Sequence, residues 1–94
     1  MRVISNRRLV DFGQLHADAA GPLQTWRKLM ESRDYQGFND LKQTFGATDI
    51  VGDKYVFDIR GNRYRLICRI DYRAQHCYIR AIMTHTQYER GDWK

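Results

Sequence analysis

The sequence is poor in the residues that build metal centres, disulfide frameworks and membrane spans. Its 94 residues include two cysteines, Cys68 and Cys77, whose separation does not match a C-x-x-C redox or zinc motif. No apolar run approaches the roughly 18 residues that a membrane span needs, and no apolar leader segment begins the chain. These absences favour a reducing, cytoplasmic setting without a membrane.

Motifs for nucleotide-dependent and metal-dependent catalysis are also missing. The sequence has no Gly-rich phosphate loop, no Ser/His/Asp set and no carboxylate cluster suited to Mg²⁺. We therefore expect no cofactor and no metal. There is no internal repeat or linker, and 43% hydrophobic residues over this length is typical of one folded domain spanning residues 1–94.

Positive charge is plentiful and unevenly distributed. The formal net charge is +5, and residues 1–51 hold seven lysines and arginines against six acidic residues. Residues 52–94 hold nine against five, so most of the excess lies in the second half. A solvated basic surface is one interpretation, but this uneven distribution favours an acidic partner such as nucleic acid.

The first half of the chain predicts a strand followed by helices. The expected elements are a strand over residues 1–4, a helix capped by Ser5 that runs to about His16, a helix from Pro22 to about Arg33, and a helical turn over residues 39–44. Leu9 and Phe12 mark the apolar face of the first helix. Residues 17–21 are expected to break the helical run, because proline suits a first helical position.

The second half predicts an antiparallel hairpin with arginines along one face. Residues 54–59 and 63–70 alternate between apolar and polar, and the Gly-Asn pair between them is typical of a type II′ turn. This turn places Asp58 opposite Arg65. The register is well determined, because a slip of one residue would bury the arginines.

A third strand over residues 77–84 is expected to pair with the second, with Ile70 opposite Cys77 and Cys68 opposite Ile79. The residues expected on the core face of this strand are Cys77, Ile79, Ala81 and Met83. The sum is an α+β domain, with the N-terminal strand and two helices packed on one face of an antiparallel sheet and the other face open and basic.

The open face is expected to collect cations and an aromatic ring. Its members are Lys54, Arg65, Arg69, Arg80 and Tyr78. Guanidinium groups bind phosphate through paired hydrogen bonds, and a tyrosine ring can stack on an unpaired RNA base. The alternative is a salt-bridged surface in which Asp58 neutralises Arg65, but one carboxylate leaves an excess of positive charge.

His85 and Tyr88 follow the last strand with the i, i+3 spacing that places two side chains on the same side of a helix. A metal-independent ribonuclease needs a base for the 2′-hydroxyl, cations for the charged phosphorane and an acid for the leaving 5′-oxygen. Histidine can serve as the base or as the acid near neutral pH. Which of the two residues is the base stays open, and an incidental pair is the alternative.

The second half of the sequence resembles HigB-type toxins of bacterial type II toxin–antitoxin systems, within the RelE/ParE superfamily. The segments that carry the resemblance are residues 55–59 with Gly61, Asn62 and Arg65, then residues 77–80, then residues 83–85 with Tyr88. The resemblance implies a RelE-like fold and an mRNA interferase that cleaves mRNA in the A site of the 30S ribosomal subunit. It also implies a HigA-like helix-turn-helix antitoxin that forms a hetero-oligomer with the toxin.

The resemblance also implies roles for individual residues. Arg65 and Arg80 match the strand positions that hold the scissile phosphate, and His85 and Tyr88 match the terminal catalytic positions. The sequence departs from the family pattern directly after Tyr88, where Glu89 occupies a position at which such toxins often have an aspartate. The residues expected to bind RNA are Lys54, Arg63, Arg69 and Tyr78.

Two other functions share much of this pattern. A non-catalytic inhibitor that binds RNA or the ribosome would use the same basic face. A ParE-like gyrase inhibitor would share the fold but not the ribonuclease chemistry. The segment from Met83 to Tyr88 argues for the ribonuclease.

Overall fold

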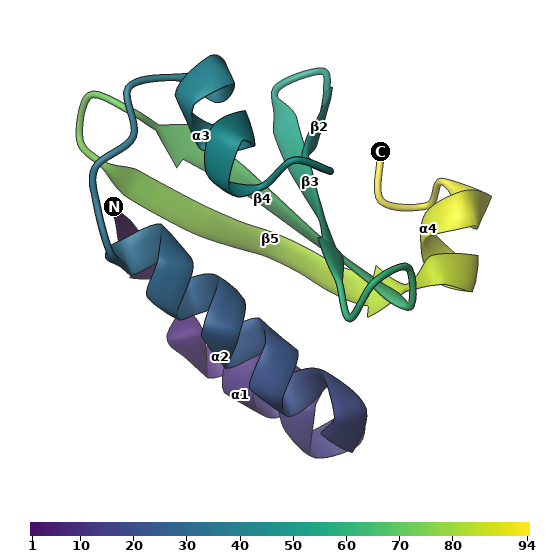
Figure 1. Ribbon diagram of the computed structural model, residues 1–94. Helices are drawn as coiled ribbons and strands as arrows, with labels where there is room; N and C mark the ends of the chain where they lie inside the picture. The colour runs from purple at the N-terminus through teal and green to yellow at the C-terminus, as the bar shows by residue number, and fades with distance from the viewer.

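An open five-stranded sheet organises the chain (Figure 1). The computed structural model describes residues 1–94. The elements in chain order are β1 (Arg2–Ile4), α1 (Asn6–Leu15), α2 (Ala17–Glu31), α3 (Phe38–Thr44), β2 (Asp49–Val51), β3 (Lys54–Ile59), β4 (Tyr64–Asp71), β5 (His76–Thr84) and α4 (His85–Arg90). The strand order is β1-β5-β4-β3-β2, with β1 parallel to β5 and all other pairs antiparallel. The α+β class expected from the sequence is confirmed.

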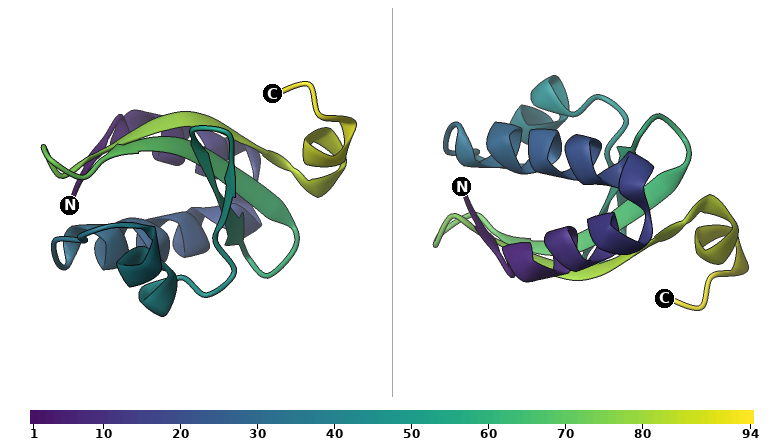
Figure 2. Two further views of the ribbon diagram at one scale, coloured as in Figure 1. Left: turned by 90° about the horizontal axis from the view of Figure 1, so that it is seen from above. Right: turned by 90° about the horizontal axis from the view of Figure 1, so that it is seen from below.

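The main core lies between the sheet and the helices. Figure 2 shows α2 and α3 on one side of the sheet, with the C-terminal segment toward the other. α2 contacts β1 and β3, and α1 lies beside α2 against β5. The buried residues of α2 recur at the spacing of one helix face; they are Ala19, Leu23, Trp26 and Met30. No helix is both long enough and apolar enough to cross a membrane.

α2 begins at Ala17, so Pro22 lies inside the helix and the expected break before it is wrong. The physical reason is packing. Ala19 is fully buried, and Gly13 of α1 approaches Ala20 so closely that a Cβ at position 13 would lie 3.0 Å from it. The burial of this first stretch of α2 outweighs the backbone hydrogen bond that a proline removes.

The register predicted for the β3–β4 hairpin is confirmed, with Asp58 opposite Arg65. The connection departs from the regular two-residue type II′ turn that was expected, because Arg60 as well as Gly61 has a positive φ, 53° and 63°, and strand pairing ends at Ile59 and Tyr64. The N–H of Arg63 donates to the carbonyl of Arg60 at 3.3 Å, which closes the turn.

A β-bulge at Arg80 interrupts the pairing of β4 with β5. Cys68 pairs with Ile79 as predicted, but Ile67 then pairs with Ala81, which leaves Arg80 as the extra residue. The side chains of Arg80 and Ala81 therefore face the same side of the sheet. From Ala81 onward, each residue of β5 faces the side opposite to the one that was predicted.

The bulge corrects the predicted faces of β5. Ala81 and Met83 were expected to face the helices, and this is wrong, because both pack on the opposite side of the sheet. Ile82 packs against the main core instead. The resulting smaller core is formed by Val56, Ile67 and Met83 with Val51, Ala81, Tyr88 and Trp93. α4 and the residues after it thus cover one end of the second face, while the part near the β4–β5 hairpin stays open.

An ionic cluster ties the start of α2 to the β3–β4 loop. Asp18 accepts a hydrogen bond from the Tyr64 hydroxyl at 2.6 Å and pairs with Arg60 at 2.9 Å and Arg63 at 3.2 Å. The hydrogen bond from Tyr64, aided by the two guanidinium groups, lowers the pKa of the Asp18 carboxyl. The same hydrogen bond raises the pKa of Tyr64.

This cluster makes stability depend on pH in the acid range. A carboxyl whose pKa is lowered by folding stabilises the native state above its ordinary pKa, and the contribution is lost as pH falls through the folded value. Asp18→Asn is therefore expected to lower Tm at neutral pH, with a difference from the wild type that shrinks as the pH falls through the lowered pKa of Asp18.

Thermal unfolding followed by circular dichroism at neutral and acid pH checks this expectation. Asp11→Asn is the matched control, because it removes only an exposed ion pair with Arg7 and should change Tm little. A Tm of Asp18→Asn equal to that of the wild type at neutral pH would contradict the assignment.

Candidate functional site

The candidate site is built around Arg65 of β4, which is only 8% exposed although it is charged. Its Nε lies 3.1 Å from Oδ1 of Asp58. Nη1 donates to the carbonyls of Asn62 at 3.1 Å and Tyr64 at 3.2 Å, and Nη2 donates to the side-chain oxygen of Asn62. Nη2 also lies 3.2 Å from Nδ1 of His85. The guanidinium therefore forms an ion pair through Nε, and its two terminal nitrogens contact the turn and His85.

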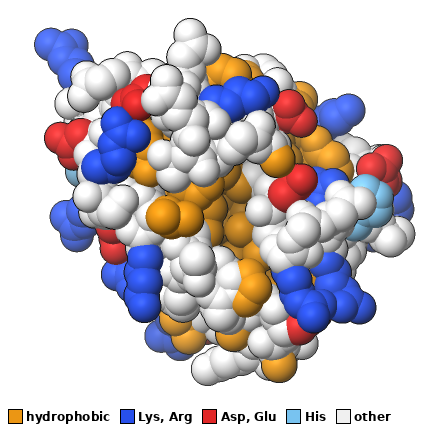
Figure 3. All heavy atoms as spheres, in the orientation of Figure 1, with side chains coloured by type: hydrophobic (Ala, Val, Ile, Leu, Met, Phe, Trp, Pro, Cys, Tyr) orange, Lys and Arg blue, Asp and Glu red, His pale blue; other side chains and the backbone are white.

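Arg65 determines the tautomer of His85. A guanidinium only donates, so the Nδ1 that faces it must accept, and the ring proton lies on Nε2. Nε2 is 3.4 Å from Oε1 of Glu89, close enough for an ion pair when the ring carries a second proton. Figure 3 shows a histidine beside acidic and basic side chains in the region of α4. The imidazole is therefore held between a cation and a carboxylate.

A capping box fixes the start of α4 and hence the direction of His85. The Thr84 hydroxyl accepts from the N–H of Gln87 at 3.2 Å, and Oε1 of Gln87 accepts from the N–H of Thr84 at 2.9 Å. The N–H of His85 itself donates to the carbonyl of Arg63 at 3.0 Å. Because of this bond, the β3–β4 loop holds both Arg65 and the first residue of α4.

Tyr88 completes the group from the next turn of α4. The Arg65 guanidinium lies over its ring, 5.3 Å from the centroid. Gly91 ends α4 with a φ of 76°, and the chain then brings Trp93 back to stack on Tyr88 with ring centroids 5.0 Å apart. Trp93 Nε1 donates to the Tyr88 carbonyl at 3.0 Å. The Tyr88 hydroxyl makes no hydrogen bond within the chain.

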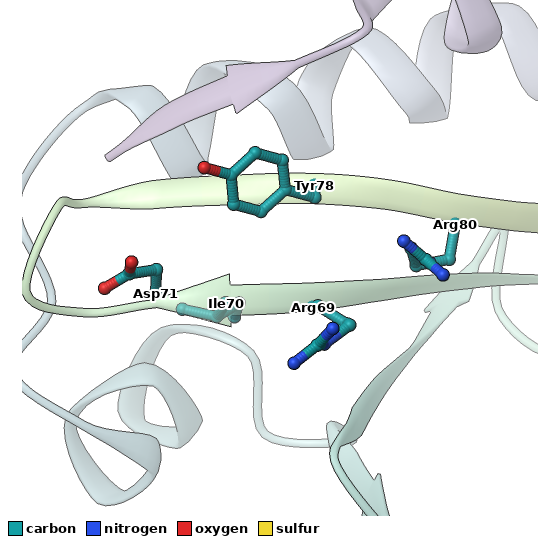
Figure 4. A pocket seen from close by; sticks show the side chains of 5 residues that line it. All are labelled: Arg69, Ile70, Asp71, Tyr78 and Arg80. Atoms are coloured by element: carbon teal, nitrogen blue, oxygen red, sulfur yellow. The ribbon is translucent and has the colours of Figure 1, made fainter.

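The open part of the same face holds a second group of predicted residues. Arg69, Tyr78 and Arg80 line a groove of about 330 Å³ together with Ile70 and Asp71 (Figure 4). Arg80, the bulge residue, has no ion-pair partner in the chain, whereas Nε of Arg69 pairs with Asp53 at 3.2 Å.

The other two predicted residues lie at the margins of these groups. Lys54 contacts Asp53 at 3.5 Å, and the positive charge of Lys54 lowers the pKa of that carboxyl. Because Asp53 also pairs with Arg69, Lys54 borders the groove. Arg63 points instead toward Asp18 of α2.

Three contributors to the site were not predicted from the sequence. Asn62 was identified only as a turn residue, Glu89 only as a departure from a pattern, and Trp93 not at all. The position of Asn62 next to Arg65 in the turn was the available signal. Trp93 had none, because its contact with Tyr88 depends on how the chain leaves α4. No group of three or more His, Cys, Asp or Glu side chains is placed to hold a metal ion.

Comparisons with known proteins agree with one another. A sequence profile of the HigB toxin family, described as the RelE-like toxic component of a toxin–antitoxin system, matches residues 19–91. The mRNA interferase toxin HigB of Escherichia coli strain K12 is 26% identical over 92 residues, which cover 95% of this chain and 88% of the relative. The mRNA interferase HigB of Shigella flexneri shows the same identity and coverage.

The two arginines on this face should differ in what they contribute to stability. Arg65→Ala leaves Asp58 without its partner and removes a buried side chain, so we expect the free energy of unfolding to fall by about 1–3 kcal/mol. Arg80→Ala removes no ion pair and should change it by less than about 0.5 kcal/mol.

Urea denaturation of both variants measures these values. Equal losses would contradict the assignment of Arg65 as the structural centre of the site. The comparison also separates two effects, because lost activity in Arg80→Ala cannot be attributed to lost stability.

Proposed function

Because the chain belongs to the HigB toxin family of RelE-like toxic components of toxin–antitoxin systems, we propose that it is an endoribonuclease that cleaves mRNA during translation. Relatives covering nearly the whole chain carry the name mRNA interferase. The observation that carries the proposal is the contact between Arg65 and His85, with the unpaired hydroxyl of Tyr88 beside it. This is a base, an acid and a cation within one side-chain cluster.

In the proposed reaction the 2′-oxygen of the RNA attacks the adjacent phosphorus, and the bond from phosphorus to the 5′-oxygen breaks. The proton of the 2′-hydroxyl passes to the base, and the acid gives a proton to the leaving 5′-oxygen. The products are a 2′,3′-cyclic phosphate and a 5′-hydroxyl end. The reaction therefore needs one base, one acid and positive charge near the phosphorane.

We assign the base to Nδ1 of His85. In the free protein this atom accepts from Nη2 of Arg65. When substrate binds, a phosphate oxygen accepts the hydrogen bond from Nη2 of Arg65 in place of Nδ1. The lone pair of Nδ1 is then free to accept the proton of the 2′-hydroxyl. Glu89 then stabilises the imidazolium that forms, because its carboxylate already faces Nε2 at 3.4 Å.

The acid is then Tyr88, because its hydroxyl makes no hydrogen bond within the chain and can donate to the leaving 5′-oxygen. Arg80 contacts non-bridging phosphate oxygens of the RNA backbone beside the scissile bond, since its guanidinium is exposed and forms no internal ion pair. Lys54, Arg69 and Tyr78 bind the flanking RNA. Arg63 contributes through Asp18 and through its carbonyl, which holds His85 in place.

The family also bears on the partner of this protein. A toxic component of a toxin–antitoxin system implies an antitoxin partner. We propose that this partner is a HigA-like helix-turn-helix protein that forms a hetero-oligomer with the toxin, and that cleavage takes place in the cytoplasm, in the A site of the 30S subunit. The excess of positive charge in the second half of the chain suits binding to ribosome and mRNA.

The proposal is tested by inducing the protein in growing bacteria and mapping new mRNA ends that carry a 5′-hydroxyl. The wild type should produce new ends within translated regions. His85→Ala should reduce their number by roughly 10²–10⁴-fold, the usual contribution of a general acid or base. Tyr88→Phe should also reduce them, since it removes only the hydroxyl.

Thr86→Ala is the matched control, because Thr86 is an exposed neighbour on α4 with no contact to Arg65. It should cleave like the wild type. Growth arrest without new ends, unchanged in His85→Ala, would contradict the nuclease and favour a non-catalytic inhibitor of the ribosome. Intact mRNA together with DNA damage would favour a gyrase inhibitor.

A further inference from the structure

The groove beside the candidate site has two chemically different ends. Figure 4 shows the guanidinium of Arg80 lying over the space between β5 and β4, toward Arg69. The Tyr78 ring and the Asp71 carboxylate lie nearer to the β4–β5 hairpin. One end therefore attracts an anion, and the other offers an aromatic face and a hydrogen-bond acceptor.

The aromatic end is held in place before any ligand arrives. Tyr78 is 40% exposed, and its hydroxyl lies 3.1 Å from Nδ1 of His76. The two rings meet edge to face, with centroids 5.8 Å apart. A ring fixed in this way loses little conformational freedom when a flat ligand stacks on it.

The acidic side chain at this end has one oxygen free. Oδ1 of Asp71 accepts from the N–H of Ala74 at 3.1 Å, and Oδ2 makes no contact within the chain. A carboxylate oxygen accepts from an amino group and repels a carbonyl oxygen in the same place. Cytosine carries an amino group at position 4, where uracil carries a carbonyl.

We propose that this groove binds one nucleotide of single-stranded RNA, with the phosphate between Arg69 and Arg80, the base stacked on Tyr78, and an amino group of the base donating to Asp71. The volume of about 330 Å³ lies at the lower end of the range for small-ligand sites, about 300–1,000 Å³, and suits a single nucleotide. The inference rests on the proposed function, since it takes RNA to be the ligand.

The groove and the catalytic cluster hold different nucleotides of one strand. Arg65 and Arg69 lie four residues apart on β4, which corresponds to about 13 Å at about 3.3 Å per residue. The cationic end of the groove is the end nearer to Arg65. The strand thus passes from the scissile phosphate over Arg80 to a base that the groove reads, so the groove contributes to the choice of cleavage position.

Nucleoside monophosphates test the groove directly. The full-length His85→Ala protein, labelled with ¹⁵N, is titrated with cytidine 5′-monophosphate, uridine 5′-monophosphate and ribose 5-phosphate while its NMR spectrum is recorded. Cytidine monophosphate should shift the signals of Arg69, Tyr78 and Arg80. Uridine monophosphate should bind roughly three- to tenfold more weakly. Ribose 5-phosphate should bind more weakly than either.

Variants identify the parts of the groove. Tyr78→Ala should weaken the binding of cytidine monophosphate roughly tenfold. Asp71→Asn should remove the difference between the cytidine and uridine nucleotides. Arg73→Ala is the matched control, because it removes a cation from the same hairpin that does not line the groove, and it should bind as the parent protein does.

The inference would be overturned if no groove signals shifted, or if the shifts were confined to the surroundings of Arg65. It would also be overturned if ribose 5-phosphate bound as tightly as cytidine monophosphate, because the groove would then be only an anion site. The titration does not depend on nuclease activity, because mononucleotides lack the phosphodiester bond between nucleotides that the proposed reaction breaks. Cleavage of mRNA without binding in the groove would therefore contradict this inference alone. Binding in the groove without cleavage in cells would contradict the proposed function alone.

Discussion

The buried guanidinium of Arg65 is the interaction on which the rest of the site depends. It joins β3 through Asp58, the following loop through Asn62, and α4 through His85. A charge removed from water costs several kcal/mol unless it is paired and hydrogen-bonded. Each partner is therefore confined to the position that satisfies Arg65. The same cation gives the site its charge and determines where its imidazole and phenol lie.

The β-bulge at Arg80 divides the second face of the sheet into two parts. Beyond the bulge, Met83 faces α4 and packs in the smaller core with Tyr88. The ring of Tyr88 in turn lies against the guanidinium of Arg65. Tyr78, before the bulge, and Arg80, at the bulge, stay exposed. A regular strand would have placed Met83 in the main core and left α4 without an apolar anchor. One inserted residue thus produces a closed region and an open region side by side.

Features determined by neighbouring residues could be predicted from the sequence, whereas features that depend on distant packing could not. The opposition of Asp58 and Arg65 could be predicted from the Gly-Asn turn signal and from the alternation of the residues on either side of it. The start of α2 at Ala17 depends on close packing against α1, which outweighs a nearby proline. The bulge at Arg80 carries no glycine or proline to mark it. The place of Trp93 depends on the smaller core, which the predicted faces of β5 did not contain.

The two tryptophans of the chain lie in different cores. Trp26 of α2 is 4% exposed and meets Phe57 edge to face in the main core, whereas Trp93 stacks on Tyr88 beside the site. The protein therefore carries two tryptophan fluorophores that report on separate regions. With Trp26 replaced by phenylalanine, the remaining tryptophan emission comes from the C-terminal segment alone. Any displacement of α4 as RNA arrives then becomes visible in solution without an added dye.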